Sequence, residues 1–242
     1  MFKIAINLYS LKDHGEDDLD EMFKKVKNAG YDGVETYTLY GLTALELKEK
    51  LDKIGLNCVS MHVGYDNFIN DIDKVICDAK TLGSHYVVIP WTDPQSEEEV
   101  MSIVNFIKNN AALIRESGLS WLYHNHDQEF KILDKGRNFF EILTDNTDNS
   151  EVDLQVDTYW VVEGGSTLKD FINRFKSRIK AFHLKDKGAV GDGDLNFPIV
   201  LEAARNLAHE WLIVEQEHFD SDPYEEIKTS YTNIRKMEAD MQ

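Results

Sequence analysis

Hydrophobic residues follow two alternating patterns from one end of the chain to the other. In several segments the apolar residues are three or four positions apart, which is the spacing of one helix face; these segments are 19–29, 69–82 and 100–114. Short runs rich in Val, Ile, Tyr and Trp follow them, as is typical of strands. Glycine, which ends helices in a left-handed conformation, separates helix from strand at Gly30, Gly55, Gly83 and Gly118.

The two patterns predict eight strands that alternate with eight helices. The strands are expected at 2–8, 33–37, 56–63, 85–90, 119–126, 152–157, 179–185 and 211–217, and the last helix at 223–238. Such alternation gives a parallel sheet, and eight short repeats within 242 residues fit a single α/β domain, a (β/α)8 TIM barrel over residues 1–242. The alternative is an open doubly wound sheet, which is disfavoured because no glycine-rich phosphate loop follows the first strand.

Charge and cysteine content narrow the class of protein. The chain has 26 Lys and Arg against 44 Asp and Glu, a net charge of −18. A surface this acidic repels nucleic acid and anionic membranes, and we therefore expect neither as a partner. Cys58 and Cys77 form no CxxC pair, the N-terminal run shows no cleavage-site pattern, and no stretch approaches membrane-spanning length. We therefore expect a cytoplasmic protein that handles a neutral small molecule or a cation, with both thiols buried.

Polar residues gather where the predicted strands end, the position of functional residues in a barrel. They are Glu35, His62, His124, His126, Asp157, His183, Lys185, Glu215 and Glu217. Imidazoles and carboxylates that converge from several strands suit a divalent ion such as Mn, Zn, Co, Ni or Fe, and suit Mg less well. The sequence thus predicts one divalent metal ion at the mouth of the barrel.

Five ordered segments resemble a known family. They are YHNHDQEF (123–130), VDTYWVVEGG (156–165), FHLKD (182–186), VGDGDLNF (190–197) and IVEQE (213–217). Across essentially the whole chain, the sequence resembles the sugar phosphate isomerase/epimerase family, the xylose isomerase-like barrels. That family includes ketose epimerases, sugar-acid isomerases, inosose and dehydroshikimate dehydratases, and lyases or hydrolases of 3-keto-sugars. The resemblance implies a sugar as substrate without specifying which sugar.

The resemblance also implies a set of metal ligands, one from each of the last four strands. The usual set is Glu, Asp, His and Glu, and here it becomes His124, Asp157, His183 and Glu215. The first position departs from the family, because His124 stands where a glutamate usually serves both as ligand and as one half of the acid–base pair. His126 is the alternative ligand from the same strand.

In such a site, a metal that polarises the sugar carbonyl makes the adjacent C–H acidic, and a carboxylate removes the proton to give an enediolate. Protonation on the other face epimerises the sugar, protonation of the neighbouring carbon isomerises it, and loss of a β-hydroxyl dehydrates it. The candidate catalytic residues are Glu215, Glu129, Glu35 and Lys185. The candidate substrate contacts are His62, His126, Trp160 and Glu217, with Trp160 replacing a histidine that is common in the epimerases.

Each assignment has a plainer alternative. Glu35 and His62 could be hydrogen-bonded core residues, and Lys185 could pair with Asp186. We expect a metal-dependent isomerase or epimerase, with a lyase, dehydratase or hydrolase as the first alternative and a non-catalytic sugar-binding barrel as the second. The endonuclease IV branch is disfavoured by the net charge of −18. The resemblance also suggests a homo-oligomer.

Overall fold

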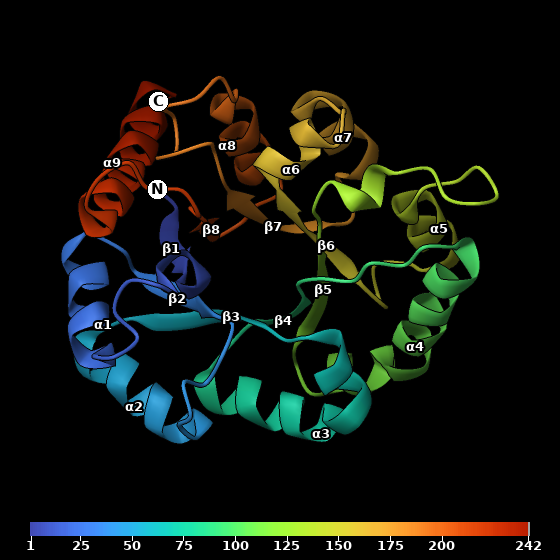
Figure 1. The fold of residues 1–242 in the computed structure, drawn as a ribbon, viewed down its shortest axis with the longest axis horizontal. Coiled ribbons are helices and arrows are strands. Elements are labelled where there is room, and N and C mark those ends of the chain that lie inside the picture. The colour runs from blue at the N-terminus through green and yellow to red at the C-terminus, as the bar shows by residue number, and fades with distance from the viewer. Residues whose placement is uncertain (242) are drawn as a thin grey trace.

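A computed structural model describes residues 1–241, which form a closed barrel of eight parallel strands in sequence order (Figure 1). The strands are β1 (Lys3–Asn7), β2 (Gly33–Thr36), β3 (Asn57–His62), β4 (Tyr86–Ile89), β5 (Ser120–His124), β6 (Asp153–Asp157), β7 (Ile179–Leu184) and β8 (Trp211–Val214). The barrel closes because β1 pairs with both β2 and β8. The prediction of a TIM barrel is confirmed.

Helices surround the barrel on its outer side (Figure 1). They are α1 (Leu19–Asn28), α2 (Ala44–Ile54), α3 (Tyr65–Leu82), α4 (Glu97–Glu116), α5 (Phe139–Asn146), α6 (Thr158–Glu163), α7 (Leu168–Phe175), α8 (Phe197–Asn206) and α9 (Pro223–Asp240), with short 3-10 turns η1 (Leu8–Leu11) and η2 (Gln128–Phe130). None of these helices, within residues 1–241, is both long and apolar enough to cross a membrane.

The expectation of one helix after each strand is wrong after β6, where α6 and α7 follow one another. The Asp157 side chain caps α6 by accepting a hydrogen bond from the N–H of Trp160, so a helix begins directly at the end of the strand. Gly165, with a φ of 84°, then turns the chain before α7 begins.

Several strands are shorter than predicted. β5 ends at His124 and β8 at Val214, so His126 and Glu217 lie in the loops beyond their strands. The predicted glycine stops are confirmed at Gly55 and Gly83, which are left-handed helix caps with φ of 78° and 76°. Cys58 is buried as expected, whereas Cys77 is exposed on α3, so the expectation of two buried thiols is wrong.

The inside of the barrel has its own apolar cluster. It consists of Ala5, Val59, Val88, Leu122, Ala181, Trp211 and Ile213. Trp211 begins β8 and closes the N-terminal end of the barrel. Gly33 makes room for it, because a Cβ there would lie 3.0 Å from the Trp211 ring and 2.6 Å from the Asn57 carbonyl oxygen. Polar side chains occupy the opposite, C-terminal end of the barrel interior.

Candidate active site

A bulge in β3 directs His62 into the barrel. Val34 pairs with Cys58 and Glu35 pairs with Ser60, so β3 has one extra residue, Val59, between these two pairs. An extra residue reverses the alternation of side chains beyond it. His62 consequently lies inside the barrel within 2.9 Å of Glu35, while its neighbour Met61 packs against the outer core.

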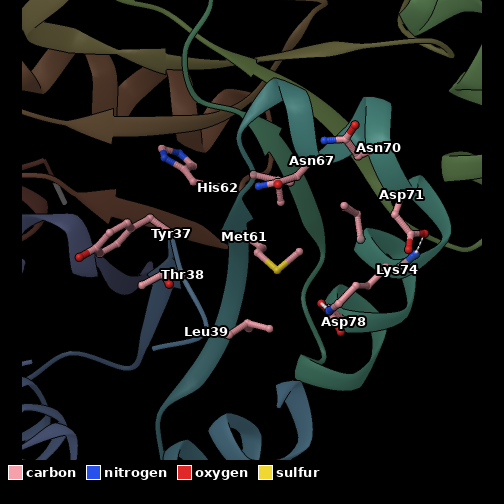
Figure 2. Close-up of a pocket in the computed structure, with 12 residues that line it drawn as sticks. Tyr37, Thr38, Leu39, Met61, His62, Asn67, Asn70, Asp71, Lys74 and Asp78 are labelled. Carbon is pink, nitrogen blue, oxygen red and sulfur yellow. Dashed lines mark hydrogen bonds and ion pairs between the residues drawn. The ribbon is translucent and has the colours of Figure 1, made fainter. Parts of the chain in front are cut away.

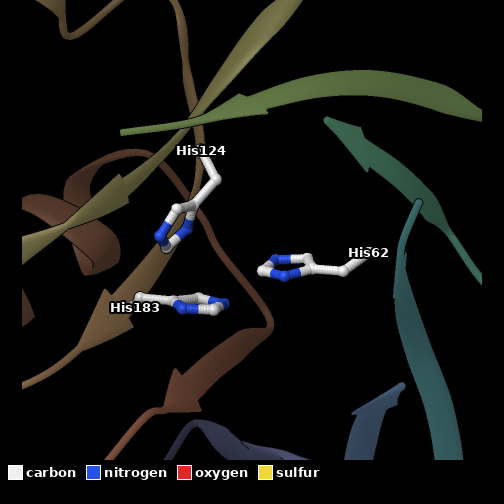
Figure 3. Close-up of side chains that lie close together, drawn as sticks. All are labelled: His62, His124 and His183. Carbon is white, nitrogen blue, oxygen red and sulfur yellow. The ribbon is translucent and has the colours of Figure 1, made fainter. Parts of the chain in front are cut away.

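Four buried side chains converge at the C-terminal end of the barrel. They are His124 on β5, Asp157 on β6, His183 on β7 and Glu215 just after β8, and each offers a potential ligand atom within 4.8 Å of the others. The fold thus brings together the four residues that the resemblance implies as metal ligands. His62 joins His124 and His183 in a second, overlapping group, whose three imidazoles are drawn in Figure 3.

The imidazole of His183 lies between two carboxylates. Its Nδ1 is 2.7 Å from Glu215 Oε2, and its Nε2 is 2.7 Å from Glu35 Oε1. Burial alone would lower the pKa of His183, but Glu35 and Glu215 outweigh it and raise the pKa to about 10. Glu35 therefore lies against the second nitrogen of a candidate ligand, where carboxylates are common around metal-bound histidines, and the contact is an ion pair without hydrogen-bond geometry.

Gln155, which the sequence reasoning missed, connects the histidines to Glu35. Its Oε1 accepts hydrogen bonds from His62 Nε2 at 2.7 Å and His124 Nδ1 at 2.9 Å, and its Nε2 donates to Glu35 Oε2 at 2.6 Å. Alternation along β6 could have revealed it, because Gln155 lies two residues before Asp157 and so faces the same side.

A divalent cation fits the site beside Asp157 Oδ2 and the His124 imidazole, where it would displace the proton that the raised pKa of His183 keeps on the His183 ring. Glu35, Asp157 and Glu215 are almost completely buried, and a buried carboxylate is costly unless it is compensated. Burial raises the pKa of Asp157 to about 7, and its Oδ2 atom has no hydrogen-bond partner among residues 1–241. Burial lowers the pKa of His124, so its imidazole is neutral at pH 7 and its Nε2, 4.0 Å from Asp157 Oδ2, is suited to bind a metal.

A pocket of about 430 Å³ opens above these residues, a size usual for small-molecule sites. Of the predicted residues, it is lined by His62, His124, His126, Trp160, Glu215 and Glu217, and the sequence reasoning missed Tyr9 and Tyr37. His126 lies between Trp91 and Trp160, with ring centroids 4.7 Å and 5.4 Å away. These three rings form an aromatic wall, and burial lowers the pKa of His126 to about 4.

Lys185 lies behind the carboxylates of this pocket. Its Nζ is 3.0 Å from Glu217 Oε1, 3.9 Å from Glu215 Oε1 and 4.8 Å from the centroid of the Trp160 ring. Burial alone would raise the pKa of Glu215, but Lys185 and His183 outweigh it and hold this pKa well below its ordinary value. Lys185 therefore keeps Glu215 ionised.

Two other acidic residues near the site have structural partners. Glu129 accepts hydrogen bonds from the Tyr123 hydroxyl at 2.8 Å and from the N–H of His126 at 2.7 Å. It lies on the outer side of β5, where Tyr123 packs against Phe139, and not with the four converging residues. Asp186 accepts backbone hydrogen bonds from residues 187, 191 and 193, so it shapes the loop after β7 and is not the ion-pair partner of Lys185.

A second pocket of about 320 Å³ lies beside the first, between β3 and α3 (Figure 2). Its walls include Met61, Leu39 and Lys74, and it shares Tyr37 and His62 with the larger pocket. The converging carboxylates and imidazoles lie at the larger pocket, so the chemistry is expected there.

Comparison with known proteins agrees with this geometry. Residues 23–237 match the family described as xylose isomerase-like TIM barrel. The chain belongs to this family. A crystal structure of a sugar phosphate isomerase/epimerase from Parabacteroides distasonis superposes with a TM-score of 0.87 at 22% identity, over 97% of this chain and 94% of that one. The 3-keto-D-glucoside 4-epimerase of E. coli superposes with a TM-score of 0.77 at 16% identity, over 98% of this chain and 100% of that one.

Curated relatives with similar sequences are inosose dehydratases. The enzyme of Mesomycoplasma hyopneumoniae is 25% identical over 92% of this chain and 90% of its own. The match with the enzyme of Clostridium perfringens, at 27% identity, covers 50% of this chain and 48% of that protein, so it spans about half the length of that relative. Proteins similar to this chain therefore include both epimerases and dehydratases.

Proposed function

We propose that this protein is a metal-dependent sugar isomerase or epimerase, which acts on a ketose or keto-sugar through an enediolate. The observation that carries the proposal is the convergence of His124, Asp157, His183 and Glu215. Two of these residues, His124 and Glu215, line a pocket of ligand size. Family membership supports the same class of chemistry, since similar proteins include a 3-keto-D-glucoside 4-epimerase and an inosose dehydratase.

In this proposal His124, Asp157, His183 and Glu215 would hold a divalent ion. Such an ion, when bound, would supply Lewis-acid polarisation of the substrate carbonyl and so make the adjacent C–H group more acidic. Glu215 is ionised because Lys185 lies beside it, so it accepts the proton from that carbon. His62 and Glu217 bind sugar hydroxyl groups.

The aromatic wall of Trp91, His126 and Trp160 packs against the sugar ring and excludes water. Glu35 and Gln155 orient the imidazoles of the site, and Glu129 holds the loop that carries His126.

Solvent exchange tests the proposal. The metal-loaded protein is incubated in D2O with a panel of ketoses and 3-keto-sugars, and the recovered sugars are examined by NMR. The expected result is deuterium at the carbon next to the carbonyl, together with an epimer or isomer. Absence of exchange with every sugar of the panel would overturn the proposal, and tight binding of metal and sugar without exchange would indicate a non-catalytic sugar-binding barrel.

A dehydratase that uses the same site is the second candidate. The Mesomycoplasma relative, similar over 92% of this chain, is an inosose dehydratase. Within residues 1–241, the carboxylates on the pocket wall are Glu215 and Glu217, two neighbours that follow β8. Epimerisation needs acid–base groups on both faces of the sugar, whereas loss of water can proceed on one face.

Mass spectrometry separates the two candidates. An isomerase or epimerase returns a product of the same mass as the inosose or keto-sugar supplied. A dehydratase gives a product that lacks one water and absorbs in the near ultraviolet, because its new double bond is conjugated with the carbonyl group. Both reactions require Glu215, so the Glu215→Gln variant serves as the blank for each.

A further inference from the structure

Two overlapping groups of candidate ligands lie at the barrel centre, the four converging residues and the three histidines. The orientation of the rings prevents His62 and His183 from binding the same ion. His62 and His183 face one another, with centroids 5.3 Å apart and ring planes only 11° from parallel (Figure 3). The lone pairs of imidazole nitrogens lie in the ring plane. Two parallel rings therefore do not direct their lone pairs at an ion between them, and the trio of His62, His124 and His183 is not arranged as a metal site.

Gln155 fixes which nitrogens carry protons. Its Nε2 donates to Glu35 Oε2 at 2.6 Å, which leaves Oε1 facing the two imidazoles. An amide oxygen only accepts hydrogen bonds, so His62 Nε2 and His124 Nδ1, at 2.7 Å and 2.9 Å, each present a proton to it. The remaining nitrogen of His124, Nε2, keeps its lone pair on the side of Asp157.

We propose that Gln155 is a positioning residue that selects one ligand set over the other. It holds His124 in the tautomer that presents Nε2 to an ion beside Asp157, and it occupies His62 Nε2 so that His62 stays outside the metal site. Glu35 orients the amide and also contacts His183 Nε2, so one chain of contacts sets both histidines. The part of this inference that concerns metal binding rests on the proposed function. The part that concerns the histidine tautomers does not, because the tautomers exist in the metal-free protein.

The test compares wild-type protein with Gln155→Met, a change of similar volume that removes all three amide hydrogen bonds, to His62, His124 and Glu35. Long-range proton–nitrogen NMR of the metal-free proteins reports the tautomers directly. We expect His124 as the Nδ1–H tautomer in the wild type and a shift toward the Nε2–H tautomer in the variant. Calorimetric titration with Mn²⁺ is expected to show affinity about 10–100-fold weaker in the variant, the usual effect of removing a partner of a metal-bound histidine.

Gln128→Met is the matched control. Gln128 Nε2 donates to the carbonyl oxygen of Thr92 at 3.1 Å, so its loss removes a glutamine hydrogen bond without touching either imidazole. The control is expected to keep wild-type tautomers and Mn²⁺ affinity.

The proposal is overturned if wild-type His124 is the Nε2–H tautomer, a result that needs no variant to fold. It is equally overturned if Gln155→Met leaves both the tautomers and the Mn²⁺ affinity unchanged. That result would show that Gln155 only packs in the core, because loss of a packing residue lowers the stability of the protein and nothing else. If the wild type binds no Mn²⁺ while the tautomers respond to Gln155→Met, the metal-dependent function fails and the positioning role stands.

Discussion

The two ends of the barrel interior are filled with opposite kinds of side chain. At the N-terminal end, Trp211 and its neighbours form an apolar plug. At the C-terminal end, three carboxylates and three imidazoles are buried together, among them Glu35, His62 and Asp157. Burial of apolar surface stabilises the fold, whereas buried charges cost free energy unless they are paired or bind a cation. Stability and chemistry are thus separated along the barrel axis.

The N-terminal end of the barrel also contains a buried charge, that of Arg178. Arg178 donates to the carbonyl oxygens of Thr147 and Val152 and to the hydroxyl of Thr147, and it lies 3.9 Å from Asp153. Its charge is therefore neutralised by backbone oxygens and one carboxylate, which ties together the chain segments at the bottom of the barrel. Among the described residues, unpartnered carboxylate oxygens occur at both ends, at Asp153 Oδ1 and at Asp157 Oδ2. The difference is that the C-terminal end brings several carboxylates and imidazoles within ligand distance of one another.

The largest expected effect concerns Glu215. Changing Glu215 to Gln removes both a candidate ligand charge and the proposed base, so the rate of deuterium exchange into the sugar should fall about 10²–10⁴-fold. The matched control is Glu210→Gln at the N-terminal end, where Glu210 pairs with Lys3 on the surface. Exchange that survives in Glu215→Gln would remove this residue from the chemistry.

A change at the apolar plug should affect stability instead. Trp211→Ala is expected to lower the free energy of unfolding by about 3–5 kcal/mol, as for other buried aromatic residues, while the folded variant keeps its Mn²⁺ affinity. Urea denaturation and calorimetry measure the two quantities separately. A folded variant that no longer binds metal would show that the two ends are not independent.

Loss of a candidate ligand should act on metal binding. His183→Ala is expected to weaken Mn²⁺ binding by at least about 100-fold. Losing a residue that only hydrogen-bonds to a ligand weakens metal affinity by up to about 100-fold, and losing the ligand itself should cost at least as much. The control is His85→Ala, because His85 is an exposed histidine at the N-terminal end. Equal affinities in the two variants would contradict the placement of the site.

The smallest expected effect is a pH dependence at the N-terminal end. Burial raises the pKa of Asp153 to about 6, above the unfolded value of about 4. The folded state therefore disfavours ionised Asp153, and its contribution to the free energy of unfolding decreases as the pH rises from about 4 through 6. At pH 7.5, Asp153→Asn should stabilise the protein by about 1–2 kcal/mol.

Urea denaturation at pH 4.5 and pH 7.5 checks this sign. The wild type should lose stability relative to Asp153→Asn between the two pH values. A variant that is less stable than the wild type at pH 7.5 would instead show that the contact of Asp153 with Arg178 outweighs the cost of burial.

The sequence predicted the barrel and the convergence of His124, Asp157, His183 and Glu215, because in this fold a position at a strand end determines a position in space. It could not predict the bulge at Val59, and simple alternation along β3 would have directed Met61 inward instead of His62.

The sequence also could not predict the directions of side chains that follow the strand ends. Glu129 and Lys185 follow strands as functional residues do, yet Glu129 turns to the outside of β5 and Lys185 lies behind Glu215. Gln155 carries no charge and belongs to no motif. Alternation along β6 places it on the same face as Asp157, but its contacts with the two imidazoles reveal its role.

Anomalous diffraction from crystals soaked in Mn²⁺ tests the separation of chemistry from stability most directly. The predicted result is a single anomalous peak within bonding distance of His124, Asp157, His183 and Glu215, which disappears in His183→Ala and persists in Trp211→Ala. A peak centred among His62, His124 and His183, or a wild-type map without a peak at the C-terminal end, would contradict the site described above.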